Sequence, residues 1–160
     1  MKLHARLAAI ASLVSVLGAA HAMTVKMPRS FAQARKDGAY LFMHDHFGSQ
    51  VRAPLSTAES FANFGKTEGP RMTCSTCHAD GVAPGHLPNG STVPSLKTAA
   101  AYFPRVVADG HLRTLAQEIR HCVRTGIKGR APSIGGPAVV DLEAYLTSLA
   151  KGTPLAPNAH

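Results

Sequence analysis

Apolar residues recur at helical spacing in three parts of the chain. The first pattern runs from Ser30 to Phe47; Gly38 interrupts it, so a later helix start at Asp37 is an alternative. The second runs from Leu112 to Thr125 and is followed by Gly126, a residue type that often ends helices. Both patterns predict amphipathic helices.

The third pattern, from Ala138 to Leu149, predicts the last helix of the chain. Its inward face is expected to carry four aliphatic residues, Val139, Leu142, Leu146 and Leu149. A shorter stretch, Ser95 to Tyr102, precedes Pro104 and predicts a short helix. Together these segments predict an all-α fold.

Glycine and proline mark the connections between these helices. They are dense between Gly81 and Pro94, which is expected to be a loop, and a second loop is expected from Lys128 to Pro137. Gly48 to Arg71 has the composition of an irregular insertion. Residues 152–160, with two further prolines, are predicted to form a flexible tail.

The N-terminal residues have the features of an export signal. Lys2 and Arg6 precede an apolar run from Leu7 to Ala20, and Ala20-His21-Ala22 has the small-x-small form of a cleavage site. The run is shorter than the roughly 20 residues that span a membrane, which leaves an uncleaved anchor as the alternative. We expect a signal peptide at residues 1–22, a domain at 23–151 and a periplasmic location.

Composition narrows the possible classes of protein. The 160 residues suit one domain, but aromatic residues make up only 6% and tryptophan is absent, so a large prosthetic group would help to fill the interior. Lys and Arg outnumber Asp and Glu by 17 to 9, and loss of Lys2 and Arg6 lowers the formal charge from +8 to +6. Export and the lack of interleaved aromatics argue against nucleic-acid binding.

The three cysteines cannot all pair with one another, and the sequence around two of them gives a reason. Cys74-Ser75-Thr76-Cys77-His78 has the Cys-x-x-Cys-His form of a c-type haem attachment site. Cys74 and Cys77 lie about one helical turn apart, so each can form a thioether with a haem vinyl group. His78 can then bind iron as the proximal ligand. The motif predicts one covalently bound haem c.

Two other kinds of site use similar residues. A thioredoxin-type dithiol needs a strand–helix context, and no clear strand pattern lies near Cys74 and Cys77. A structural zinc site needs four ligands, usually from two paired knuckles, and no second Cys-x-x-Cys is present. Cys74, Cys77, His78 and Cys122 would be the available zinc ligands.

With this motif the chain resembles the class I cytochrome c family. Asp37-Gly38-Ala39-Tyr40-Leu41-Phe42 is similar to the family's N-terminal helix, and the segment Asp141 to Leu149 is similar to its C-terminal helix. The resemblance implies that these two helices cross and enclose the haem. It also implies electron transfer as the function, with redox proteins as partners.

The sixth iron ligand departs from the commonest pattern of that family, which is a methionine downstream of the motif. No methionine follows His78 in this chain. On the predicted helix from Leu112 to Thr125, Cys122 shares the apolar face, while His121 lies about 100° away and is expected to point outward. We therefore expect Cys122 to be the distal iron ligand.

Other assignments stay open at this point. Cys122 can be an inert core thiol, since free cysteines are often buried. His86 and His111 would give a His/His centre, Lys97 and Lys128 are more remote ligands, and an open sixth position would suit a small-ligand-binding cytochrome.

The segment Thr114 to Cys122, with Gly126-Ile127-Lys128-Gly129, also resembles thiosulfate dehydrogenases and SoxA-type sulfur-oxidation cytochromes. In those families a cysteine at the matching place ligates the catalytic haem. Such relatives usually carry two haems, whereas this chain has one attachment motif. The resemblance implies an alternative function, oxidation of thiosulfate or a related sulfur compound.

Charge and ligand type bear on the choice of function. A thiolate ligand stabilises ferric iron and lowers the reduction potential relative to methionine. Basic residues are frequent between Arg105 and Arg130, and they are expected to meet haem propionates, an acidic redox partner or a small sulfur oxyanion. The leading hypothesis is electron transfer through one haem, followed by sulfur oxidation and then by five-coordinate ligand binding.

Overall fold

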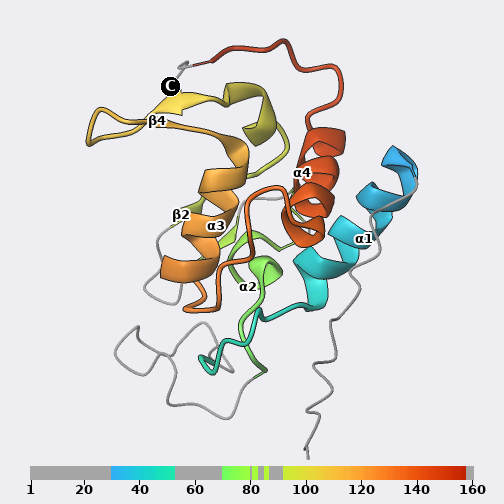
Figure 1. Cartoon of the computed structure of the whole chain (residues 1–160), viewed down its shortest axis with the longest axis vertical. Coiled ribbons are helices and arrows are strands. Elements are labelled where there is room, and N and C mark those ends of the chain that lie inside the picture. Colours follow the sequence, from blue (N-terminus) through green and yellow to red (C-terminus); the bar gives the residue numbers. More distant parts are fainter. Residues whose placement is uncertain (1–29, 53–69, 80, 83–84, 87–91, 158–160) are drawn as a thin grey trace, which may run out of the picture.

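The computed structural model describes residues 30–52, 70–79, 81–82 and 92–157, together with the backbone of residues 85–86. The predicted signal peptide and most of the predicted insertion between Gly48 and Arg71 lie outside these ranges. Four α-helices dominate the described part (Figure 1). Among its helices none is both long and apolar enough to cross a membrane.

Helices α1 (Phe31–His44) and α4 (Pro137–Leu149) cross and pack closely against each other (Figure 1). Ser30 caps α1, because its side-chain oxygen accepts a hydrogen bond from Gln33 N at 3.2 Å. The helix therefore starts at Phe31, and the later start at Asp37 is wrong. Gly38 is buried inside α1, where it lets the backbone of α4 approach closely.

Helix α3 (Leu115–Thr125) begins three residues later than the sequence pattern predicts. Thr114 is its N-cap: Thr114 Oγ1 accepts from Gln117 N, and the Gln117 side chain accepts from Thr114 N at 2.8 Å. Leu112 consequently lies in a strand and is 60% exposed, so its predicted place as the first residue of this helix is wrong. Gly126 is the C-cap, as predicted.

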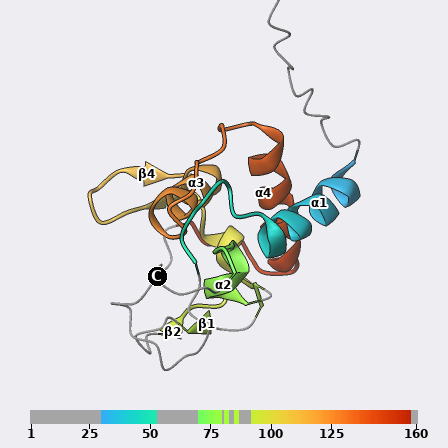
Figure 2. The ribbon, with the colours of Figure 1, turned by 90° about the horizontal axis from the view of Figure 1, so that it is seen from below.

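Two short antiparallel strand pairs accompany the helices, which corrects the purely helical expectation. Strand β1 (Gly85–His86) pairs with β2 (Thr92–Val93) within the predicted loop, beside α2 in Figure 2. Strand β3 (Arg105–Val106) pairs with β4 (Leu112–Arg113), and this hairpin leads directly into α3. The predicted short helix at 95–102 is a 3₁₀ helix, η2 (Ala99–Tyr102).

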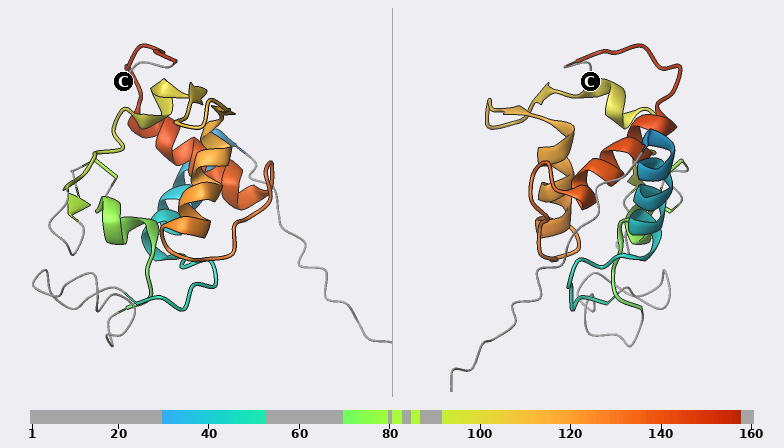
Figure 3. Two further views of the ribbon diagram at one scale, coloured as in Figure 1. Left: turned by 90° about the vertical axis from the view of Figure 1, so that its left-hand side faces the viewer. Right: turned by 45° about the vertical axis from the view of Figure 1, so that its right-hand side comes forward.

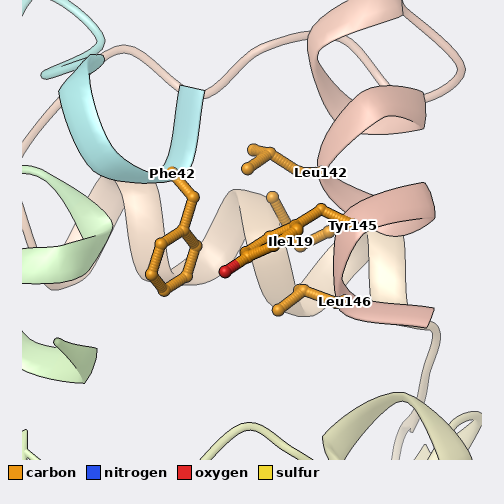
Figure 4. Close-up of a cluster of buried hydrophobic side chains, with 5 residues drawn as sticks. All are labelled: Phe42, Ile119, Leu142, Tyr145 and Leu146. Atoms are coloured by element: carbon orange, nitrogen blue, oxygen red, sulfur yellow. The ribbon is translucent and has the colours of Figure 1, made fainter. Parts of the chain in front are cut away.

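The main core lies where α1, α3 and α4 meet (Figures 3 and 4). It consists of Phe42, Ile119, Leu142, Tyr145 and Leu146. The rings of Phe42 and Tyr145 lie 5.4 Å apart at 56°, a tilted arrangement that aromatic pairs favour. Of the residues expected on the inner face of α4, Val139, Leu142 and Leu146 are buried and Leu149 is half-buried.

A second cluster of Met72, Val123 and Ile127 fixes the segment that precedes α2 (Cys74–His78). Met72 is 1% exposed, and its backbone N donates to the Val51 carbonyl at 2.9 Å. The five-residue helix α2 thus starts from a buried anchor and is held close to both α1 and α3.

Candidate haem site

A mostly apolar cavity of about 160 Å³ lies between α2 and α3 and is bordered by residues of α1, α4 and the segment around η2. Its walls include the side chains of both motif cysteines, His78 and Cys122. Aliphatic and aromatic residues supply most of the remaining wall: Phe42, Leu96, Phe103, Leu115, Ile119, Val123, Ile127, Leu142 and Leu146.

Local hydrogen bonds set the direction of the motif residues on α2. Thr73 precedes the helix, and its backbone N donates to Thr76 Oγ1 at 3.0 Å. This capping hydrogen bond fixes the start of α2, a helix that is too short to be stable alone. Cys74, Cys77 and His78 consequently all border the cavity.

The two motif cysteines are free thiols in a poorly solvated environment. Burial, with smaller effects from nearby groups that include Cys122, raises the pKa of Cys74 to about 12. Burial also raises the pKa of Cys77. Both side chains are therefore protonated at neutral pH, and neither has the lowered pKa of a reactive redox thiol.

His78 has the properties of a metal-binding imidazole. Burial lowers its pKa, while a weaker interaction with the Pro94 backbone acts in the opposite direction. The neutral ring is the form that binds metals. Its Nδ1 is buried and has no hydrogen-bond partner within normal geometry among the described residues.

Cys122 also lines the cavity, on the face of α3 that carries Leu115 and Ile119. Its exposed surface borders this cavity, yet the surrounding protein still desolvates the thiol. Burial and, to a smaller extent, Glu118 raise the pKa of Cys122 to about 11. His121 instead lines a separate groove on the outer side of α3, in the direction predicted from helical spacing.

The other proposed iron ligands lie elsewhere or outside the described residues. His111 is exposed and lines the outer groove, and Lys97 and Lys128 are exposed residues that do not border the cavity. The side chain of His86 is outside the described part of the chain. Within that part, Cys122 is the candidate distal ligand that lines the same cavity as His78.

The alternatives of a zinc site and a redox dithiol fit this geometry poorly. Among the described residues, no three His, Cys, Asp or Glu side chains are close enough together to hold a metal ion. In the same part of the chain, the motif follows an isolated bridge between Arg52 and Arg71, whereas a thioredoxin site follows a strand of a βαβ unit. Two thiols, a neutral imidazole and a large apolar wall fit haem c.

Glu118 is a wall residue that the sequence reasoning did not single out as a site residue. Its carboxylate contacts Arg105 Nη2 at 3.4 Å and Arg113 Nη1 at 3.0 Å, and its Oε1 lies 3.9 Å from Cys122 Sγ. The Arg105 guanidinium also stacks over the Phe103 ring at 5.0 Å from the centroid. The spacing of Glu118 and Cys122, four residues on one helix, was the available signal.

Comparison with known proteins identifies related sequences. A family model described as "SoxA/TsdA, cytochrome c domain" matches residues 59–155. A thiosulfate dehydrogenase of Allochromatium vinosum is 28% identical over 108 residues, which cover 67% of this chain and 39% of that protein. The present chain therefore spans about two fifths of the length of this relative.

A solved structure gives an independent comparison of the fold. Thiosulfate dehydrogenase (TsdBA) from Marichromatium purpuratum, in its as-isolated form, matches with a TM-score of 0.55 at 19% identity. The match covers 87% of this chain and 30% of that chain. At this level of identity the likeness shows a shared fold.

Proposed function

Since the chain belongs to the SoxA/TsdA cytochrome c domain family, we propose that it is an exported monohaem cytochrome c that transfers electrons. The observation that supports this proposal is one cavity that Cys74, Cys77, His78 and Cys122 all line. The predicted location is the periplasm, and the predicted partner is a redox protein with an acidic docking face.

Each polar wall residue has a separate role in this proposal. Cys74 and Cys77 would hold haem c through thioethers, His78 would be the proximal iron ligand, and Cys122 would be the distal ligand. The bound haem supplies a one-electron iron couple. Thiolate ligation by Cys122 favours ferric iron, so we expect a lower reduction potential than methionine ligation would give.

The apolar wall supports electron transfer by limiting water around the site. Phe42, Ile119, Leu142 and Leu146 belong both to this wall and to the rigid core where the helices meet. A site built on packed helices changes little between two charge states, which keeps reorganisation small. The walls therefore suit an electron carrier, in which no covalent bond of the protein forms or breaks when the iron changes its charge.

A second candidate function is oxidation of thiosulfate or a related sulfur compound. It is favoured by Cys122 on the cavity wall and by the relatives described as thiosulfate dehydrogenases. Arg105 and Arg113 pair with Glu118, whose Oε1 also lies 3.9 Å from Cys122 Sγ, and their positive charge would attract a sulfur oxyanion. A five-coordinate cytochrome that binds small ligands is the third candidate.

Two measurements on the exported protein test these functions. Haem staining after denaturing electrophoresis should detect covalent haem in the wild type, and Cys74→Ala/Cys77→Ala should abolish it. Voltammetry should give a reversible one-electron wave, and thiosulfate with an artificial acceptor should give no turnover. Absence of covalent haem would refute both leading functions, whereas thiosulfate turnover would replace the carrier with the enzyme. Fast carbon monoxide binding to the reduced protein would favour the third candidate.

A further inference from the structure

We propose that a groove between the start of α1 and the end of α4 is the docking site for an acidic partner protein. The inference deepens the proposed function and rests on it for one point, namely that this partner exchanges electrons with the haem. It assigns the partner to a definite surface, which is distinct from the basic stretch between Arg105 and Arg130.

The shape of the groove is the first argument. It has a volume of about 440 Å³ and lies where the first turns of α1, the end of α4 and η2 come together (Figure 1). Ala101 and Ala150 are buried residues of its lining, whereas Phe31 and Leu155 are 59% and 80% exposed. Two large apolar side chains exposed at one groove are typical of a surface that a partner covers.

The segment after α4 completes the groove. Thr153 N donates to the Ala150 carbonyl at 2.9 Å, and Ala156 N donates to the Ala101 carbonyl of η2 at 2.9 Å. Leu155 lies between these two tied positions and lines the groove. Its backbone is therefore already held in place, so covering Leu155 with a partner requires little further loss of chain entropy.

Charge indicates the kind of partner. Arg35 and Lys151 line the groove, and among the described residues of its lining none is acidic. Neither of these two side chains forms an ion pair within the described part of the chain. Apolar side chains beside two cations complement an acidic surface that presents an apolar side chain of its own.

Two other possible occupants carry the wrong charge. A second copy of this chain has the same formal net charge of +8, so its approach would be opposed by like charges. Residues 23–29, which precede α1 in the sequence, include Lys26 and Arg29 and no acidic residue. Either occupant would add positive charge beside Arg35 and Lys151.

The groove also lies close to the proposed haem site. In η2, Ala99 lines the haem cavity, whereas the next residue, Ala100, lines the groove. In α4, Leu146 lines the cavity and Thr147 lines the groove. These two elements thus form a shared wall between the two spaces. A partner in the groove would lie across this wall from the haem, an arrangement that suits electron transfer.

The first test measures how the haem-loaded protein binds a short fluorescent peptide of alternating glutamate and leucine, by fluorescence anisotropy. We expect Leu155→Ser to weaken binding about tenfold, because it removes an apolar contact. Arg35→Gln and Lys151→Gln should each weaken it about twofold to fivefold, as expected for exposed ion pairs. Lys36→Gln is the matched control, an equal charge change at an exposed residue of α1 that does not line the groove, and should bind like the wild type.

Several results of this test would overturn the proposal. Equal losses in Lys36→Gln and Arg35→Gln would mean that the peptide binds by diffuse charge attraction. Unchanged binding in Leu155→Ser would mean that it binds elsewhere. Much tighter binding after deletion of residues 23–29 would show that this segment occupies the groove. A dimer in analytical ultracentrifugation that Leu155→Ser dissociates would show that a second copy does.

The second test separates the groove from the carrier function. Voltammetry is recorded on gold coated with carboxylate- and methyl-terminated alkanethiols, which imitates an acidic apolar partner, and on a hydroxyl-terminated coating. On the mixed coating the wild type and Lys36→Gln should exchange electrons several times faster than Leu155→Ser, and on the hydroxyl coating all three should be alike. Equal rates of all three on the mixed coating would overturn the docking site. Absence of a wave on both coatings would instead refute the carrier function, and peptide binding would still report on the groove.

Discussion

Asp141 places a carboxyl group in the contact between α1 and α4. The residue is 7% exposed, and its Oδ1 has no hydrogen-bond partner among the described residues. Burial raises the pKa of Asp141 above its ordinary value, and the charge of Asp37 raises it further. A buried carboxylate oxygen without a hydrogen-bond partner costs stability whenever the group is ionised.

This environment predicts a stabilising substitution. Because the folded pKa is raised, the folded state holds the proton more tightly than the unfolded chain. The contribution to stability is therefore greatest at low pH and is lost as pH rises through the raised pKa. Asp141→Asn should raise the free energy of unfolding by about 1 kcal/mol at pH 7. The gain should shrink toward pH 4, as measured by denaturant unfolding at several pH values.

The matched control for this prediction is Asp37→Asn. It removes the second cause of the raised pKa and leaves the burial of Asp141 unchanged. We expect a smaller gain than for Asp141→Asn. A loss of stability in Asp141→Asn at pH 7 would mean that the carboxylate has a favourable partner after all.

At the residue scale, sequence reasoning located the site but not its electrostatics. Cys122 was predicted to face inward because helical spacing fixes its side relative to Leu115 and Ile119, and it lines the cavity. The contacts of Glu118 with Arg105 and Arg113 depend on where the hairpin meets α3. No local pattern in the sequence encodes that meeting point.

Gly38 shows how one position controls the pairing of two helices. A Cβ atom added at Gly38 would lie 1.9 Å from the Asp141 carbonyl oxygen and 2.9 Å from Tyr145 Cβ. The first of these neighbours is backbone, so the helices would have to separate. The glycine is therefore a packing residue inside α1, although the sequence pattern presented it as a break.

Gly38→Ala should consequently destabilise the domain. The gain in helix propensity is about 1 kcal/mol, but overpacking of this contact should outweigh it and give a net loss of about 2 kcal/mol or more. Thermal unfolding followed by circular dichroism measures the change. Lys36→Ala, at an exposed site of the same helix, should be near neutral. Equal stability of Gly38→Ala and the wild type would show that α1 and α4 do not pack this closely.

The capping box at Thr114 gives a prediction for α3. Thr114→Ala removes the side-chain acceptor for Gln117 N and should cost about 1 kcal/mol. The comparison is Thr125→Ala at the exposed end of the same helix, where the hydroxyl donates to the His121 carbonyl. Thr125→Ala should lower the free energy of unfolding by less than Thr114→Ala. If both substitutions cost the same in chemical denaturation, the cap does not define the start of α3.

At the element scale, the long helices were predictable from the sequence, whereas the two short pairs of β-strands were not. Helix α4 matches its predicted range within one residue, because aliphatic residues recur regularly along it. Each strand has two residues, too few for alternation to be detected. The start of α3 was encoded in Thr114-x-x-Gln117, a signal that the longer apolar pattern from Leu112 obscured.

The whole domain is organised around its cavity. The walls come from all four helices and from the segment around η2, so residues far apart in sequence border one space. The scarcity of aromatic residues is consistent with an interior that is completed by a prosthetic group. The composition alone predicted that a prosthetic group helps to fill the interior. Which residues line the cavity could be seen only in the folded structure.

Loss of haem should therefore destabilise the entire domain. We expect Cys74→Ala/Cys77→Ala, which cannot form the thioethers, to lose the cooperative thermal transition of the wild type, because the apolar wall has no bound partner. Differential scanning calorimetry measures this. Haem-loaded Cys122→Ala should retain a cooperative transition, since its covalent attachment is intact. Equal melting of the double variant and the wild type would contradict a structural role for haem.

The pairing of His78 with Cys122 across one cavity is the central claim. Low-temperature EPR of the ferric protein, recorded with Cys122→Ala and His111→Ala, tests it most directly. The account predicts a low-spin, thiolate-type signal in the wild type and in His111→Ala that disappears in Cys122→Ala. A spectrum that does not change in Cys122→Ala would contradict the assignment of Cys122 as the distal iron ligand.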